Sequence, residues 1–251
     1  MDSSYLTGPH CDLEWGRRGA GRAAERGDIL VICDVLSFST TCVVANQRGA
    51  RIYPCIDGKE ALRCAAQFGA EIAVRREETS ADHRFSLSPN SMLAAGPLDR
   101  IALPSPNGAT CCRIGAAVPA LIVASHLNAS ASARAAAALS AEFKANITVV
   151  SCGERWIQPN EEGQLRFALE DYLGAGAVLS GLDMAFSPGA SVCRSAFSAS
   201  QADIHNIIAN CESGIELRDR GWPEDVEHAV QLVTCDVVPL LIDGCLVGRR
   251  F

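Results

Sequence analysis

Acidic and hydroxyl side chains come directly after an apolar run in the first part of the chain. The run covers residues 29–33, Asp34 follows it, and Thr40 and Thr41 belong to the hydroxyl-rich segment beyond. Such a run is typical of a strand buried on both faces of a parallel sheet. Because ligands of open α/β folds bind beyond the carboxyl ends of the strands, Asp34 is a candidate for metal binding or catalysis. Helix capping is the alternative role for Asp34, and capping or turn formation is the alternative for both threonines.

Further polar clusters follow the other predicted strands. They occupy residues 75–78, 104–108, 125–128 and 152–155. Because the carboxyl ends of parallel strands lie along one edge of a sheet, we expect these clusters to converge. Several of them precede a helix, whose free backbone N–H groups favour an anion. Acidic groups beside such loops indicate a divalent hard cation that bridges a phosphorylated substrate.

Most members of these clusters have a structural alternative. Glu77 also suits a solvated loop, and Asn107 with Gly108 also suits a simple turn. His126 is more typical of a structural histidine than of a catalytic one, and Cys152 of a buried thiol.

Glu170 and Asp171 are adjacent acids in a predicted helix. Neighbouring helix residues point roughly 100° apart, so we expect one of the two, rather than both, to bind a metal ion. An ion pair between Arg166 and Glu170, four residues apart, is the alternative.

Common phosphate-binding motifs are missing from the sequence. It has no Gly-x-x-x-x-Gly-Lys-Ser/Thr loop, and the segment after Asp34 lacks the second aspartate of an Asp-x-Asp phosphatase. Gln158 stands where a cysteine phosphatase starting at Cys152 needs arginine, and the glycines at 174 and 176 lack the third glycine of a dinucleotide fingerprint.

The elements that position these residues alternate along the chain. We predict strands at 29–33, 51–56, 71–74, 100–103, 120–124 and 147–151, and a hairpin of 237–242 with 245–247. Helices are predicted at 42–48, 59–68, 109–117, 130–144 and 166–180, with a further helix starting at 88–89. This alternation predicts an α/β fold, a three-layer sandwich around a mostly parallel sheet. We expect one domain over 1–251, with the helical region 187–228 as a possible subdomain.

Composition limits the classes of partner and compartment. The net charge of −7 and the lack of a basic run argue against nucleic acid and against an anionic membrane surface. No apolar stretch approaches the roughly 20 residues that span a bilayer, and residues 1–27 lack the apolar core of a signal peptide. The 12 cysteines form no Cys-x-x-Cys pair, so we expect reduced, mostly buried thiols in a cytoplasmic protein.

The order and spacing of these clusters resemble the 2-phosphosulfolactate phosphatase (ComB-type) family over most of the chain. The motifs that carry the resemblance are 34–41, Arg76-Glu77, Ser88-Pro89, 104–108, Asn128-Ala129, 153–156, 168–171 with 174–176, and 236–239.

The resemblance implies a ComB-like α/β protein that uses Mg²⁺ to hydrolyse a small phosphorylated organic acid. The typical reaction converts 2-phospho-3-sulfolactate to 3-sulfolactate and phosphate, on a route to coenzyme M. By motif position, Asp34 and Glu77 are the implied catalytic residues, and both join Glu170 or Asp171 in the implied metal site. The implied substrate-binding residues are Thr40, Thr41, Ser105, Asn107, Gly108, Asn128 and Arg155. The attacking group stays open between a metal-activated water and Asp34.

The chain departs from the family pattern at the anion-binding positions. Ser37 stands where the best-supported members carry arginine after Asp-Val-Leu, and segments 76–80 and 104–108 differ from Gly-Glu-Arg-Asn-Gly and Thr-Thr-Thr-Asn-Gly. A hydroxyl cannot replace the bidentate guanidinium, although Arg75, Arg76 or Arg155 are candidates to compensate. We therefore favour phosphatase chemistry over the named substrate. The alternative is a non-catalytic anion-binding or regulatory homologue, and a homo-oligomer is possible in either case.

Overall fold

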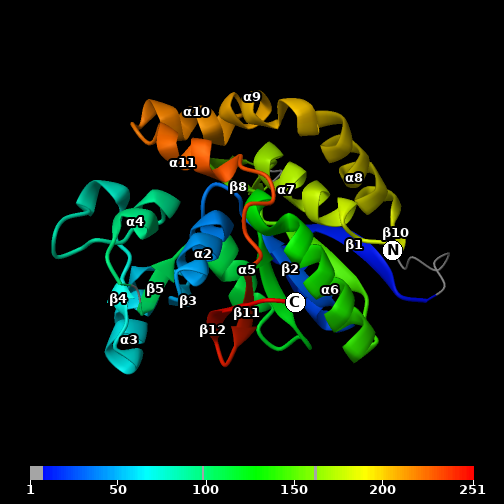
Figure 1. Ribbon diagram of the computed structural model, residues 1–251, viewed down its shortest axis with the longest axis horizontal. Helices are drawn as coiled ribbons and strands as arrows, with labels where there is room; N and C mark the ends of the chain where they lie inside the picture. The colour runs from blue at the N-terminus through cyan, green and yellow to red at the C-terminus, as the bar shows by residue number, and fades with distance from the viewer. Residues whose placement is uncertain (1–7, 98, 161–162) are drawn as a thin grey trace.

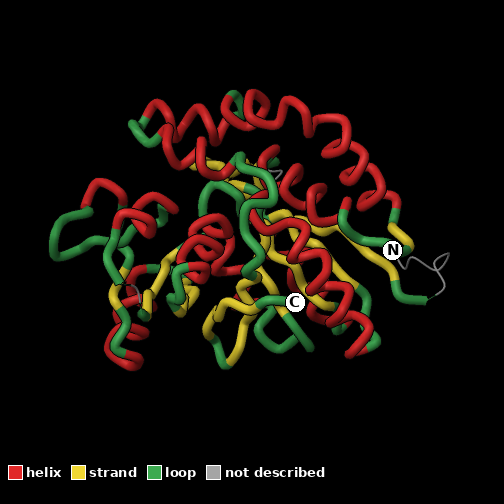
Figure 2. Tube along the Cα trace, in the orientation of Figure 1, coloured by secondary structure: helices red, strands yellow, loops and turns green. Residues whose placement is uncertain are grey.

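The computed structural model describes residues 8–97, 99–160 and 163–251 (Figure 1). Its centre is a ten-stranded sheet with helices on both faces (Figure 2). In spatial order the strands are β10 (Ala185–Phe186), β1 (His10–Trp15), β7 (Ile147–Ser151), β2 (Ile29–Cys33), β6 (Leu121–Ala124), β11 (Val238–Ile242), β12 (Cys245–Arg249), β3 (Arg51–Cys55), β5 (Arg100–Pro104) and β4 (Glu71–Ile72).

The sheet is mostly parallel, as the sequence predicts. The strands from β10 to β6 pair in parallel, and so do β3, β5 and β4. The β11–β12 hairpin joins the two sets through antiparallel pairings to β6 and β3. Its two-residue turn is Asp243-Gly244, with φ of 50° and 77°, which matches the predicted Asp-Gly hairpin.

Alternate residues of β2 enter two different hydrophobic clusters. Ile29 and Val31 pack on one face of the sheet, and Leu30 and Ile32 on the other. The first face is covered by α6 (Ala129–Phe143) and α7 (Leu169–Ser180); the second is covered by α1 (Gly16–Arg26), α2 (Phe38–Gln47), α4 (Pro89–Ala94) and α5 (Gly108–Ile114). Helix α3 (Gly58–Phe68) packs beside β3 and β5. The predicted three-layer sandwich is confirmed.

Four further helices extend the layer of α6 and α7 into an arch above α7 (Figure 1). They are α8 (Pro188–Ser200), α9 (Ile204–Ala209), α10 (Glu212–Asp219) and α11 (Pro223–Ala229). Phe197, Ile208 and Val226 from these helices belong to the same cluster as Ile29 and Val31, so the arch shares the core of the sheet.

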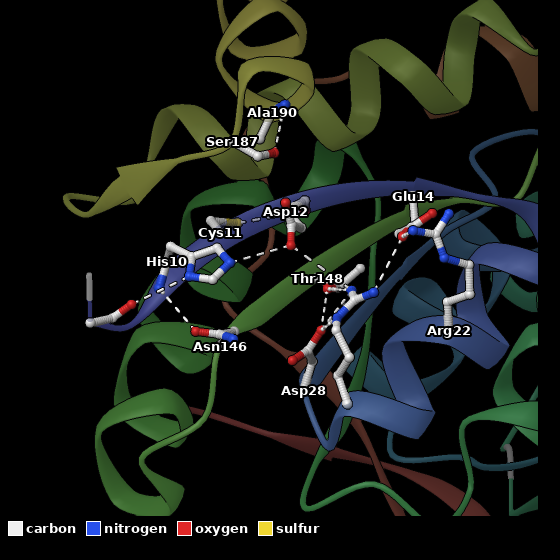
Figure 3. Close-up of polar contacts among 12 residues, drawn as sticks. His10, Cys11, Asp12, Glu14, Arg22, Asp28, Asn146, Thr148, Ser187 and Ala190 are labelled. Atoms are coloured by element: carbon white, nitrogen blue, oxygen red, sulfur yellow. Dashed lines mark hydrogen bonds and ion pairs between the residues drawn. The ribbon is translucent and has the colours of Figure 1, made fainter. Parts of the chain in front are cut away.

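The N-terminal strand and helix are features that the sequence did not predict. The Arg26 guanidinium of α1 lies 2.8 Å from the Asp28 carboxylate, 3.4 Å from Glu14 and 3.0 Å from the Thr148 hydroxyl. Figure 3 shows this polar network, in which the His10 ring also faces Asp12 at 3.4 Å. Asp28 precedes β2, so the network lies at the opposite end of that strand from Asp34.

The cysteines are all free, and eleven of the twelve are buried. This arrangement agrees with the expectation of reduced thiols rather than a disulfide framework. Within the described residues, no helix is long and apolar enough to cross a membrane.

Candidate active site

Asp34 lies where β2 ends, and it is held by the loop that follows β5. Its Oδ2 accepts a hydrogen bond of 2.6 Å from the Gly108 backbone N–H and one of 3.4 Å from the Ser105 hydroxyl. The side chain of Phe38 and Asp34 Oδ2 occupy the space beside Gly108, where an added Cβ would lie 2.2 Å and 2.8 Å from them. Only glycine fits at this close approach. The structure therefore brings together Asp34, Ser105 and Gly108 as the sequence predicts.

Asp171 fixes two neighbouring loops from the start of α7. Its Oδ1 accepts a 2.6 Å hydrogen bond from the Val35 N–H, and its Oδ2 accepts one of 2.9 Å from the Gly153 N–H. Both oxygens are therefore used to hold the loops after β2 and β7. Of the two acids predicted as alternatives for the metal site, this pattern favours Glu170 as the ligand and gives Asp171 a positioning role.

Glu170 directly precedes Asp171 in α7, and only 2 % of its surface is exposed. Its Oε2 accepts a hydrogen bond of 3.3 Å from the Cys211 thiol. The predicted alternative, a helical ion pair with Arg166, is wrong because α7 begins at Leu169. Arg166 instead pairs with Glu212 and Glu216 of α10.

Glu154 is a site residue that the sequence reasoning missed. It opens β8 (Glu154–Asn160), which forms a two-stranded ribbon with β9 (Gly163–Arg166). The Asn107 side-chain amide donates a 3.0 Å hydrogen bond to Glu154 Oε2, so the loop after β5 supports this acid as well as Asp34. The sequence signal for Glu154 is the motif 153–156, in which it stands next to the predicted site residue Arg155.

The four acids form one electrostatic group beside the ends of β2, β5 and β7. Burial, together with the charge of Glu170, raises the pKa of Asp34 to about 6, although hydrogen bonds from Gly108 and Phe38 oppose the shift. Burial, followed by the charges of Asp34 and Glu170, raises the pKa of Glu154 to about 7. The pKa of Asp171 is raised well above its usual range by the same causes. Such a group holds protons near neutral pH or binds a cation.

Glu77 lies outside this group, which corrects the predicted carboxylate set. It belongs to a short 3₁₀ turn after β4, η1 (Arg76–Glu78), and its side chain is about half exposed. Its Oε1 pairs with the Arg220 guanidinium at 2.8 Å. A hydrogen bond from its own backbone, followed by the one from Arg220, lowers the pKa of Glu77. The turn itself reaches the site, because the neighbouring Arg76 contacts Ser37, but the Glu77 side chain is directed to Arg220 instead.

The donor chemistry of the remaining acids fits a hard cation such as Mg²⁺. Among residues 8–97, 99–160 and 163–251, no three His, Cys, Asp or Glu side chains are placed to hold one metal ion together. Mg²⁺ is usually bound through one or two carboxylates together with substrate phosphate and water, so it does not need a three-carboxylate set. Asp34, whose Oδ2 accepts from Gly108 and Ser105, and Glu170, whose Oε2 accepts from the Cys211 thiol, are the two carboxylates considered for such a site.

Thr40, Thr41 and Asn128, which are also predicted to bind substrate, are buried, and two of them have internal hydrogen-bond partners. The Thr40 hydroxyl donates to the Val35 carbonyl at 2.8 Å, and Thr41 is fully buried with no partner for its hydroxyl among the described residues. The Asn128 amide donates to the Val123 carbonyl at 3.3 Å and the Val237 carbonyl at 3.1 Å, and its oxygen accepts from the Ser125 N–H. Asn128 thus links β6 to the segment just before β11 and does not line an anion pocket.

His126 and Cys152 match their structural alternatives. His126 is fully buried against Phe197, and burial lowers the pKa of its ring to about 4. Cys152 is 3 % exposed and follows β7.

An arginine does approach Ser37, the residue that replaces the family arginine. The Arg76 guanidinium donates a 2.8 Å hydrogen bond to the Ser37 hydroxyl and pairs at 2.8 Å with the Asp225 carboxylate of α11. Its carbon also lies 5.4 Å from the centre of the Trp222 ring. Asp225 is buried and accepts hydrogen bonds from Ser88 and Asn90. The Arg76 side chain therefore connects η1 with α11 and, through Asp225, with the start of α4.

A cavity of about 460 Å³ opens beside these groups. Its lining includes Arg76, Ser105, Pro106 and Arg220. The cavity therefore connects the arginine at Ser37 with the loop that holds Asp34.

Comparison with known protein families agrees with the resemblance in the motifs. A family model described as 2-phosphosulpholactate phosphatase matches residues 20–244, which is nearly the whole chain. No curated protein matches the sequence closely enough to count as a relative. The matched region includes all four acids of the candidate site, Asp34, Glu154, Glu170 and Asp171. The chain belongs to the 2-phosphosulpholactate phosphatase family.

Proposed function

We propose that the protein is a Mg²⁺-dependent phosphatase that hydrolyses a small anionic phosphate monoester, with 2-phospho-3-sulfolactate as the family's substrate. The observation that carries the proposal is the position of the Asp34 carboxylate. It is buried beside three other acids and accepts hydrogen bonds from the Gly108 N–H and the Ser105 hydroxyl. Family membership supports a phosphatase reaction.

Asp34 and Glu170 would hold the Mg²⁺ ion, which supplies Lewis-acid stabilisation of the phosphoryl oxygens when bound. Asp171 holds the loops after β2 and β7 in place through its two backbone hydrogen bonds. Glu154, whose pKa is about 7, holds a proton near neutral pH and is the candidate general acid for the leaving oxygen. Asn107 orients it through the 3.0 Å hydrogen bond to Oε2.

Arg76 is the candidate to replace the missing family arginine in substrate binding. Its guanidinium contacts Ser37, three residues after Asp34, and borders the 460 Å³ cavity. A guanidinium suits phosphate, sulfonate or carboxylate groups, because it offers parallel N–H donors.

The direct test is release of inorganic phosphate from a panel of small phosphomonoesters, with and without Mg²⁺. We expect Mg²⁺-dependent turnover of at least one ester that carries a further acidic group. The second candidate function, a non-catalytic anion-binding or regulatory homologue, is favoured by Ser37, which stands where the best-supported family members carry arginine. It predicts thermal stabilisation by the same esters without turnover of any.

A further inference from the structure

A second, smaller cavity lies beside Asn107. It has a volume of about 160 Å³, and three arginines line it, namely Arg17, Arg18 and Arg155. Asn107, Gln164, Cys152, Trp15 and Leu165 complete the lining as far as the structure describes it, and none of these eight residues is acidic. In a protein with a net charge of −7, three guanidinium groups around one small cavity are a concentrated positive charge.

These arginines lack acidic partners within the described part of the chain, where most other arginines have one. Arg17 donates a 2.6 Å hydrogen bond to the Pro106 carbonyl, which fixes its guanidinium beside Asn107. Burial, and then the positive charge of Arg155, lower the pKa of Arg17, as expected where like charges approach each other. The arrangement therefore carries an electrostatic cost that an anion in the cavity would remove.

Helix α1 increases this cost. Arg17 and Arg18 occupy its first turn, which has no acidic residue, and the residue before the helix makes no capping hydrogen bond with its side chain. Cations are unfavourable at the positive end of a helix dipole, whereas an anion there is favourable. A local arrangement that opposes stability is expected mainly at functional sites.

The cavity is adjacent to the acidic group. Asn107 lines it and also donates to Glu154 Oε2, and Cys152 lines it next to Gly153, whose N–H binds Asp171. Ligand pockets for larger molecules measure about 300–1,000 Å³, so a cavity of this size suits a single acidic group.

We propose that this cavity binds a second anionic group of the substrate, a carboxylate or a sulfonate, while the phosphate group lies at Asp34. This inference rests on the proposed function and extends it. It assigns to Arg17 and Arg18 a role in substrate selection, and it restricts the substrate to phosphate monoesters that carry a further acidic group.

Anion binding can be measured without catalysis. Inorganic sulfate in Mg²⁺-free buffer should raise the Tm of the protein, and Arg17→Gln and Arg155→Gln should each remove most of that rise. Arg63→Gln is the matched control, since Arg63 is an exposed arginine of α3 outside this cavity. The inference is overturned if sulfate does not stabilise the parent protein, or stabilises the two cavity variants as much as the control.

The kinetic test compares phosphoglycolate with ethyl phosphate, which differ in one carboxylate. We expect a preference for phosphoglycolate, and in Arg155→Gln a KM for phosphoglycolate raised about tenfold or more with little change for ethyl phosphate. Equal effects on both esters would contradict the assignment of the cavity to a second anionic group. If neither ester releases phosphate, the proposed function loses its support, and the sulfate measurement still decides whether the cavity binds an anion.

Discussion

Arg76 donates a 2.8 Å hydrogen bond to the hydroxyl of Ser37, which lies 39 residues earlier in the chain. The contact places a guanidinium beside the loop that follows Asp34, although the residue at that point of the loop is a serine. The Arg76 side chain is 13 % exposed and pairs with Asp225, whose side chain is 2 % exposed. The cationic group is therefore contributed by η1 and held by α11, on the arch of helices.

This ion pair predicts a stability effect. Arg76→Met leaves the buried Asp225 carboxylate without its cation, and we expect a loss of about 3 kcal/mol in the free energy of unfolding, measured with urea. Adding Asp225→Asn should recover part of the loss, because it removes the unpaired charge. Arg75→Met is the control: its exposed pair with Glu78 is worth little, so the free energy of unfolding should change much less than in Arg76→Met. Equal losses in Arg75→Met and Arg76→Met would contradict the account.

Asp171 predicts a second stability effect. Asp171→Ala removes the acceptor of two buried N–H groups, those of Val35 and Gly153. Each unsatisfied donor costs about 1–3 kcal/mol, so we expect a net loss of roughly 2 kcal/mol after relief of repulsion within the acidic group. Asp183→Ala, at an exposed position after α7, is the control and should change stability little. A variant at 171 as stable as the control would show that the two hydrogen bonds are unimportant.

The acidic group predicts how stability depends on pH without metal. The pKa values of Asp34 and Glu154 rise on folding, from 3.8 to about 6 and from 4.5 to about 7. Between these values the folded protein binds more protons than the unfolded chain, so its stability falls as the pH rises. The contribution is complete below pH of about 4 and is lost above about 7.

Urea unfolding at pH 5 and pH 8 in the presence of a chelator measures this dependence. The free energy of unfolding should be lower at pH 8, and Asp34→Asn should reduce the difference. In Asp183→Asn the difference should match that of the parent. Stability that rises from pH 5 to pH 8 in the parent protein would exclude the buried acidic group as described.

Metal binding distinguishes the acids that the structure brings together from the one it separates. Mg²⁺ should raise the Tm more at pH 8 than at pH 5, because protons compete with the ion for the carboxylates. Asp34→Asn and Glu170→Gln should remove the rise, whereas Glu77→Gln should retain it. A rise lost in Glu77→Gln and retained in Glu170→Gln would restore the carboxylate set predicted from the sequence.

The fold could largely be predicted from the sequence, because its central strands are short apolar runs bounded by turn residues. Six of them, β2 to β7, occur within one or two residues of their predicted limits. Strand β1 is no continuous apolar run, because it carries His10, Asp12 and Glu14, and its two acids lie 4.0 Å and 3.4 Å from the Arg26 guanidinium of α1. Only the folded chain shows that such an acidic strand has partners.

The site could be predicted only in part. Asp34, Ser105, Asn107 and Gly108 come together because β2 and β5 end near each other, and the acids of α7 reach the same place. Glu77 follows a strand end too, and its neighbour Arg76 reaches Ser37, but the Glu77 carboxylate pairs with Arg220 at 2.8 Å and lies outside the acidic group. Strand order depends on long-range pairing, such as that of β11 and β12 between β6 and β3, and no local pattern encodes it.

The central claim is that the acidic group around Asp34 hydrolyses a phosphate monoester with Mg²⁺. It is tested most directly by phosphate release from 2-phospho-3-sulfolactate and phosphoglycolate, comparing the parent protein with Asp34→Asn and the control Asp183→Asn. We predict Mg²⁺-dependent release by the parent and the control, and a loss of at least about 100-fold in Asp34→Asn with the fold retained. Release by Asp34→Asn at the rate of the parent would contradict the claim.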